Sequence, residues 1–329
     1  MLRIHFTADD LARIRIMASP DPLWEVLLSL HLLQTRHGAQ VFDTWRRRTR
    51  RSLPSSTRLL TTLAPPKGYS PDFLTPAPGA PELEAGLDSL LGTPRSRLRS
   101  DLSYLGASQR LPSWVTELAE GDTDTLRRLA MAVRRYFSVA LAPYWATISD
   151  SVRTDRDVRA RAVLDFGYER VLDTLHTTVR WRAPVLEVDY PVDQEQYLAG
   201  RGLTLVPSFF CWRKPVGLRE LTGQPVLVYP VERDADWALT ENGEFQAPLE
   251  GALGDLLGRT RSAVLEAVAD TPYLTTTDLA RSVGISVAGA SQHATVLRNA
   301  DLIATYRHSG AAKHVLRPRG AALLATPSY

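Results

Sequence analysis

Cysteine is almost absent from this sequence of 329 residues, in which Cys211 is the only one. A single thiol excludes an intrachain disulfide framework and any metal site that combines several thiolates of one chain. Long apolar runs are also missing, because no stretch approaches the roughly 18 residues of a membrane span. Near the start, the acidic pair Asp9 and Asp10 interrupts the region where a signal peptide needs a continuous apolar segment. These absences predict a cytoplasmic protein without a membrane partner.

Lysine is scarce as well, since only Lys67, Lys214 and Lys313 occur among the 39 basic residues. GC-rich coding can produce such an arginine bias, so the arginine content by itself indicates no partner. Residues 254–329 contain eight basic and five acidic side chains, which accounts for the whole net charge of +3. This local excess favours a nucleic-acid partner for the C-terminal segment.

Sequence motifs of common enzymes are lacking too. The chain has no Gly-x-Ser-x-Gly, no phosphate-binding Walker loop, no His-Glu-x-x-His and no Gly-x-Gly-x-x-Gly. Nothing therefore pairs a nucleophile with its base or cradles a phosphate. We expect no enzyme activity, no metal and no cofactor.

A chain of this length forms two or three domains, because single cores stop growing at about 250 to 300 residues. The patterns of apolar residues predict an α+β fold that is mainly α. We expect a mainly helical N-terminal domain over 1–180. A small β-rich part over 181–250 completes a sensor or dimerisation region, and a winged helix-turn-helix follows over 251–329.

Particular elements follow from the spacing of apolar residues in the N-terminal region. A strand over 2–6 precedes a helix N-cap at Thr7, and Ser19-Pro-Asp-Pro22 introduces a buried helix. The predicted helices further along are a long amphipathic one after Gly121-Asp122 and another over 155–176. Prolines limit residues 54–112 to short helices and loops. The β-prone runs that predict one small antiparallel sheet are 185–190, 203–206, 208–212 and 226–229.

The pattern near the C-terminus is typical of a helix-turn-helix. After a helix over 253–269, Thr275–Gly284 resembles a short capped helix that ends at a glycine. Ser286 is a good N-cap for a second helix that reaches about Asn299. Its apolar face consists of Ala290, Ala294 and Leu297, and its opposite side consists of Ala288, Ser291, Gln292, Thr295 and Arg298.

A face of short polar side chains and one amide suits the major groove of DNA. Gln pairs bidentately with adenine, and Ser or Thr reaches a base or a phosphate. Two strands over 302–308 and 313–317 then form a β-hairpin wing. Residues 302–319 carry Arg307, Lys313, Arg317 and Arg319 without an acidic residue, which suits contact with phosphates.

These motifs together resemble the ArsR/SmtB winged-helix repressors. The matching positions are Thr276, Leu279, Ala280, Val283 to Ser286, Ser291 to His293, Leu297, Arg298, Ala300, Leu302, Ile303, Arg307 to Gly310 and Arg319 to Leu324. The long N-terminal region makes the chain similar to the extended actinobacterial members. Ala294 and Asp301 depart from the pattern, where a larger apolar residue and a glycine are usual.

The resemblance implies a homodimeric repressor on an inverted repeat of double-stranded DNA, with Ser291, Gln292 and His293 at the DNA. Thr276–Ala280 lacks the Cys-x-Cys metal site of some members, and His308 and His314 are expected to contact phosphate or solvent instead of metal. The predicted DNA-binding residues are Thr276, Ser286, Ala288, Ser291, Gln292, His293, Thr295, Arg298, Arg307, His308, Lys313, His314 and Arg317.

Several alternatives stay open at the level of the sequence. Aromatic side chains can line an effector pocket or simply form core, and those considered are Trp181, Phe209, Phe210, Trp212, Tyr229 and Trp237. The arginine-rich stretch 45–51 is interpreted as a solvated helix end rather than a second nucleic-acid patch. The alternative for the whole chain is an enzyme or toxin-like N-terminal domain to which the winged helix is an accessory.

Overall fold

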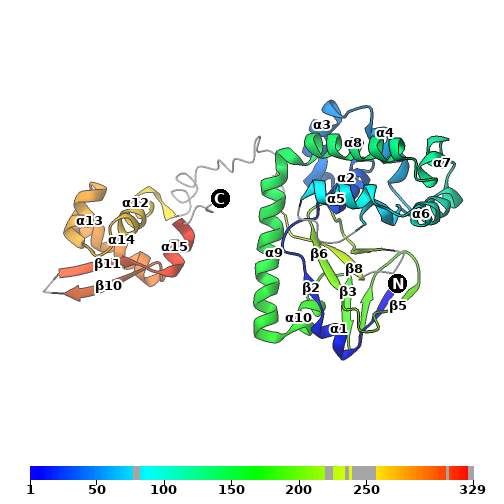
Figure 1. Ribbon diagram of the computed structural model, residues 1–329. Coiled ribbons are helices and arrows are strands. Elements are labelled where there is room, and N and C mark those ends of the chain that lie inside the picture. The colour runs from blue at the N-terminus through cyan, green and yellow to red at the C-terminus, as the bar shows by residue number, and fades with distance from the viewer. Residues whose placement is uncertain (77–81, 219–224, 234–236, 239–256, 309–310, 325–329) are drawn as a thin grey trace. The chain divides into compact units, whose positions relative to one another are not determined.

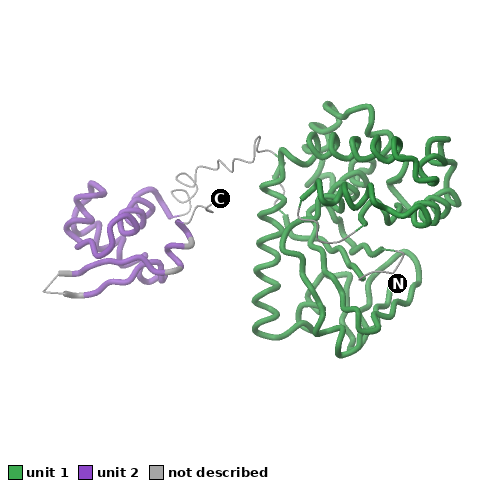
Figure 2. Tube along the Cα trace, viewed as in Figure 1, with its two compact units in different colours: residues 1–243 green, residues 244–329 purple. Residues whose placement is uncertain are grey.

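The computed structural model describes residues 1–76, 82–218, 225–233, 237–238, 257–308 and 311–324 (Figure 1). The chain divides into two compact units, residues 1–243 and 244–329, which we call unit 1 and unit 2 (Figure 2). The predicted class, α+β and mainly α with a C-terminal winged helix-turn-helix, is confirmed. The domain boundary predicted at 250/251 lies outside the described residues.

The described helices of unit 1 are α1 (Ala8–Ala12), α2 (Pro22–Leu33), α3 (Ala39–Ser52), α4 (Thr57–Leu63), α5 (Leu83–Leu91), α6 (Arg95–Ser108), α7 (Trp114–Ala119), α8 (Thr123–Ala140), α9 (Trp145–Phe166) and α10 (Tyr168–Asp173), with single turns η1 (Asp72–Leu74) and η2 (Ala142–Tyr144). Helices α2 to α8 gather on one side of the strands (Figure 1). Helix α2 is buried almost all round, and Asp21 caps its first turn by accepting from the amides of Leu23 and Trp24. Amphipathic α8 packs on α2, α3, α4 and α5. No described helix is both long and apolar enough to cross a membrane.

The helical stretch predicted over 155–176 is longer and is interrupted. Helix α9 begins at Trp145, ten residues before the predicted start, and ends at Phe166. Gly167 then takes a φ of 80°, a left-handed conformation that suits glycine, and α10 follows. Figure 1 shows α9 running beside the strands of unit 1 towards α10. In the proline-rich region, α6 occupies 14 residues between Pro94 and Pro112.

The strands of unit 1 correct the prediction of one small antiparallel sheet. They are β1 (Leu2–His5), β2 (Arg15–Ile16), β3 (Val179–Arg182), β4 (Val185–Val188), β5 (Gln194–Tyr197), β6 (Thr204–Ser208), β7 (Val216–Gly217) and β8 (Val226–Pro230). They form two sheets, in the orders β3-β4-β1-β5 and β2-β6-β8-β7. Strand β1 is parallel to β5, and β6 is parallel to both β2 and β8. All five residues of β6 are buried, as is typical of a parallel strand covered on both faces.

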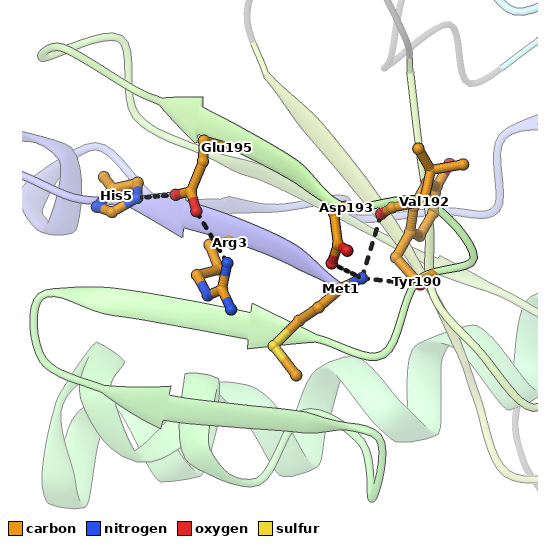
Figure 3. A network of polar contacts seen from close by, with 7 residues as sticks. All are labelled: Met1, Arg3, His5, Tyr190, Val192, Asp193 and Glu195. Carbon is orange, nitrogen blue, oxygen red and sulfur yellow. Dashed lines mark hydrogen bonds and ion pairs between the residues drawn. The ribbon is translucent and has the colours of Figure 1, made fainter.

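Strand β1 joins the start of the chain to residues nearly 200 positions later. Arg3 and His5 on β1 both bind Glu195 of β5, at 2.9 and 2.5 Å (Figure 3). The amino group of Met1 donates to Asp193 and to the carbonyls of Tyr190 and Val192. Strand β1 therefore lies between β4 and β5, in a sheet whose other strands come from residues 179–197. One hydrophobic cluster then extends from Leu2 to Ala238, so the described residues on both sides of 180/181 share a single core.

The described part of unit 2 contains four helices and a three-stranded sheet. Its elements are α12 (Arg259–Asp270), β9 (Leu274–Thr275), α13 (Thr276–Val283), α14 (Val287–Asn299), β10 (Ile303–His308), β11 (Ala311–Leu316) and a last helix α15 (Pro318–Leu324). The sheet order is β10-β11-β9, and β9 was not predicted. Side chains of α12, α13 and α14 form the core with Leu302 and Ile303.

Candidate nucleic-acid interface

The turn between α13 and α14 has the local chemistry of a helix-turn-helix. Thr275 caps α13 by accepting from the amide of Asp278, and Gly284 ends the helix at a φ of 72°. The amide of Ile285 donates to the carbonyl of Ala280, which closes the turn. Ser286 then caps α14 by accepting from the amide of Gly289 at 3.0 Å. These caps fix where each helix begins and ends.

Helix α14 has one buried face and one face open to solvent. Ala290, Ala294 and Leu297 are buried against α12 and α13, as the spacing predicted. The small Ala294, which departs from the ArsR/SmtB pattern, lies within this packed face. The rest of α14 is therefore free to meet a partner along its length.

Most of the residues predicted on the recognition face lie on this open side. Ser286, Ala288, Ser291, Gln292 and Arg298 are exposed, whereas His293 and Thr295 are half-buried. The Thr295 hydroxyl donates back to the carbonyl of Ser291 at 2.9 Å. Since successive helical residues are about 100° apart, His293 lies on the flank of the face that Gln292 occupies.

Val287 is a surface residue that the sequence reasoning missed. It is the first residue of α14 and is 50% exposed. An apolar side chain at the start of a recognition helix is suited to contact a thymine methyl group in the major groove. Its position directly after the N-cap Ser286 was the available signal.

The wing consists of the antiparallel strands β10 and β11. Lys313 lies on β11 opposite the exposed Tyr306 on β10. Arg307 and His308 are the last two residues of β10. Basic residues predicted at the DNA therefore occur on both strands of the wing, in an arrangement suited to phosphate contacts.

His314 is placed differently from its predicted position on a DNA-facing surface. Its side chain is only 3% exposed, and its Nε2 and Nδ1 atoms each lie 3.0 Å from a threonine hydroxyl, those of Thr276 and Thr305. The ring points into the domain because Thr305 and His314 are opposite each other on the face that also carries the buried Ile303. Side chains two residues apart on a strand lie on the same face, so Thr305 shares the face of the apolar Ile303 on β10. This alternation was the sequence signal that the face paired with His314 is buried. Thr276, also predicted at the DNA, is half-buried and holds this ring.

Arg317 directly follows the last residue of β11, Leu316. Its guanidinium pairs with Asp301, which Arg319 also approaches at 3.6 Å. Asp301 takes a φ of 61°, the left-handed conformation that explains why glycine is usual at this position in the ArsR/SmtB pattern. Arg317 is therefore partly neutralised by a carboxylate.

The aromatic residues considered as an effector pocket are packed in the core of unit 1. Phe209, Phe210 and Trp237 are buried and contact one another with ring centroids 4.8 to 5.7 Å apart. Phe42 of α3 packs against Phe210, Trp237 and Trp212. The sequence reasoning did not include Phe42, whose helical spacing on α3 was the signal.

The other two members lie elsewhere. Trp181 contacts Phe6 and donates to Glu169, while the Tyr229 hydroxyl donates to Asp155 at 2.5 Å. The six residues therefore form no common pocket lining.

A buried carboxylate on α2 is hydrogen-bonded to residues at the end of strand β6. The carboxylate of Glu25 accepts from the hydroxyl of Ser208 and from the amides of Phe209 and Phe210, at 2.7 to 3.0 Å. Burial raises the pKa of Glu25 to about 7, because desolvation outweighs these hydrogen bonds and the nearby positive charge of Arg233. Burial also raises the pKa of the Cys211 thiol, which makes it unreactive.

The described residues include no group of three or more His, Cys, Asp or Glu side chains that could hold a metal ion. A wide surface hollow of about 470 Å³ lies in unit 2, lined by Tyr273, Ala304, Tyr306, Val315, Leu316 and Arg317. A cavity of about 20 Å³ lies among apolar side chains of α2, α4 and α8, including Leu27, Leu60 and Val133. That volume is close to that of one water-sized probe, so the cavity is too small for an effector.

Comparison with known proteins agrees with the geometry of unit 2. Residues 257–304 match the family described as winged helix-turn-helix DNA-binding. The matched segment runs from the start of α12 into the first wing strand. No curated protein and no solved structure matches the chain. The chain therefore carries a winged helix-turn-helix of the DNA-binding type, which makes it a DNA-binding regulator.

Proposed function

We propose that this protein is a transcriptional repressor of the ArsR/SmtB type, which binds an inverted-repeat operator as a homodimer. The observation that carries the proposal is the open face of α14, with exposed Ser291, Gln292 and Arg298 beside a basic wing. The side chains of this face match the donors and acceptors of base edges and phosphates. A dimer would place two such helices on half-sites about 34 to 36 Å apart.

We further propose that unit 1 supports dimerisation and responds to an effector or a partner. Its aromatic side chains are packed and its apolar cavity is small, which favours a response at its surface or through a second arrangement of its elements. Binding would alter DNA affinity only by favouring one dimer geometry over another. The half-site spacing is the property through which such a change would act.

We propose no catalytic role for unit 1. Glu25, Cys211 and Arg233 lie beyond the carboxyl ends of the parallel strands β6 and β8, where ligands often bind in α/β sheets. Glu25 and Cys211 are fully buried, however, and three donors already occupy the carboxylate. A substrate has no access to them, so the group is better suited to hold the fold.

Binding selection followed by titration tests the proposed function. The full chain selects duplexes from fragmented genomic DNA, and a fluorescent copy of a selected duplex is then titrated by anisotropy at several salt concentrations. We expect salt-sensitive binding that prefers the selected sequence, with two protomers per duplex in analytical ultracentrifugation. Absence of any binding would overturn the proposal, and one protomer per duplex would overturn the dimer.

Two variants of α14 test the assignment of residues. Gln292→Ala should lose roughly tenfold of the preference for the selected duplex, because a bidentate base contact gives about 1 to 3 kcal/mol of discrimination. Arg298→Ala should weaken selected and unrelated duplexes alike and lower the salt slope by about one. Arg261→Ala on α12 removes one exposed positive charge away from α14 and serves as the control. Equal behaviour of the three variants would contradict the assignment.

A further inference from the structure

Three strands and a helix of unit 2 meet at His314. Its backbone pairs with Thr305 of β10 on one side and with Leu274 of β9 on the other. Its carbonyl also accepts from the amide of Tyr273 at 2.9 Å. The residue therefore lies in the middle strand, where the wing is continuous with the segment that leads into α13.

The side chain of His314 extends this junction to the helix itself. Nε2 lies 3.0 Å from the hydroxyl of Thr276, which is the first residue of α13, and Nδ1 lies 3.0 Å from the hydroxyl of Thr305. His314 is only 3% exposed, so both of its ring nitrogens depend on protein partners. One imidazole thus connects the start of the helix-turn-helix to both strands of the wing.

The chemistry of the three side chains allows both hydrogen bonds at once. Burial, together with the positive charge of Arg298, lowers the pKa of His314, so the ring is neutral at neutral pH. A neutral imidazole has one N–H donor and one acceptor nitrogen, and each threonine hydroxyl can take the complementary role. Without the ring, the half-buried hydroxyls of Thr276 and Thr305 would lose these partners at a cost in free energy.

We propose that His314 is a positioning residue for DNA binding, which fixes the wing to the first helix of the helix-turn-helix. The inference rests on the proposed function. Helix α13 packs on α14 and therefore sets its direction, while β10 and β11 carry the basic wing. Two recognition surfaces on separate elements bind one duplex best when their relative orientation is fixed in advance, because ordering them on binding costs free energy.

The test compares full-length variants on the fluorescent duplex selected by the wild-type protein. Thr305→Val keeps the side-chain shape and removes one hydrogen bond of the ring, and His314→Phe keeps a planar ring and removes both. We expect each to weaken binding by about tenfold at 25 °C, which corresponds to about 1.4 kcal/mol. The salt slope should also fall by about one, because wing contacts with phosphate are lost while α14 still binds.

A role in stability alone would give a different result. Such a role lowers the melting temperature of the variants but leaves the affinity and salt slope of the folded protein unchanged, and that outcome would overturn the proposal. Thr277→Val, at the exposed neighbour of Thr276, is the matched control and should behave like the wild type. If His314→Phe does not fold, the affinity and salt slope of Thr305→Val alone decide the test.

A double variant separates the two roles open to Thr276. If Thr276 acts through His314, adding Thr276→Val to His314→Phe should cause no further loss of affinity. A further loss of tenfold would mean that Thr276 contacts DNA directly and would overturn its part in the junction. Failure of the wild-type protein to bind any duplex would overturn the proposed function, whereas wild-type binding with unaffected variants would overturn only the positioning role.

Discussion

Units 1 and 2 differ in how the order of the chain relates to the packing of its elements. In unit 2, elements that are neighbours in the sequence contact one another, as α13 does with α14, α14 with β10 and β10 with β11. In unit 1, by contrast, Leu2 pairs with Val188 and Gln194, and Arg15 pairs with Thr204. A local sequence pattern was therefore sufficient to recognise the fold of unit 2. The fold of unit 1 could not be recognised in this way, because its sheets depend on pairings between distant segments.

The two units also use polar side chains differently. Unit 2 leaves Ser291 and Gln292 on an open helix face, where they can bind a partner. Unit 1 encloses Glu25 and the ring cluster around Phe210, where they hold segments together. All seven tryptophans lie in unit 1, so their fluorescence reports the unfolding of that unit alone.

Among the predicted substitutions, Phe210→Ala is expected to lower the free energy of unfolding of unit 1 the most, without affecting unit 2. The Phe210 side chain is buried among Phe42, Trp45 and Trp237, so its removal leaves a cavity that should cost about 3 to 5 kcal/mol. Urea unfolding followed by tryptophan fluorescence measures this loss. Leu164→Ala, at an 85% exposed position, is the control and should change the free energy of unfolding by less than about 0.5 kcal/mol. A cost below about 1 kcal/mol for Phe210→Ala would contradict the packed cluster.

The next effect concerns Glu25 and pH. Because its folded-state pKa is raised from 4.5 to about 7, the protonated carboxyl stabilises unit 1 fully below pH 4.5. This stability should be lost as pH rises through about 7, and the shift corresponds to at most about 3 kcal/mol. Urea unfolding by tryptophan fluorescence at pH 5 to 8 follows the loss.

Glu25→Gln identifies the group responsible, because glutamine stays neutral throughout this range. The variant should remove the pH dependence, although its amide faces N–H donors and lowers the overall stability by about 1 to 3 kcal/mol. Glu232→Gln, at an exposed position, should keep the wild-type profile. The same pH profile in Glu25→Gln and the wild type would rule out Glu25 as its cause.

The smallest effect is expected from Gly284→Ala in unit 2. At a φ of 72° a Cβ atom strains the backbone, so the free energy of unfolding should fall by about 1 kcal/mol. Hydrogen exchange of the α13 and α14 amides measures the change. The tryptophan midpoint should not move, and an equal shift there would show that the two units unfold together.

Capping residues and apolar spacing made several elements predictable. Thr7 and Asp10 form the reciprocal cap of α1, Asp21 caps α2, and Gly284 ends α13. These features act over three or four residues, so the sequence contains both partners within one window. The open side of α14 was predictable for the same reason, as its buried alanines and leucine recur at helical spacing.

Contacts between distant residues were not predictable in this way. The β-prone run 208–212 predicts a strand, but only Ser208 belongs to β6, because the amides of Phe209 and Phe210 donate to Glu25 of α2 instead of to a neighbouring strand. His314 was assigned to the surface by its basic neighbours, yet pairing with Thr305 turns it inward. In both cases the deciding partner lies outside the local window.

Local sequence patterns specify the helix-turn-helix near the C-terminus and its polar recognition face, because caps and helical periodicity act between neighbouring residues. The folded structure was needed to establish that strands from the first 16 residues complete the sheets of unit 1. It also decided that the aromatic side chains fill a core and that His314 joins the wing to α13. The physical reason is that strand register and burial depend on which distant segments pair, and many pairings are compatible with the same local pattern.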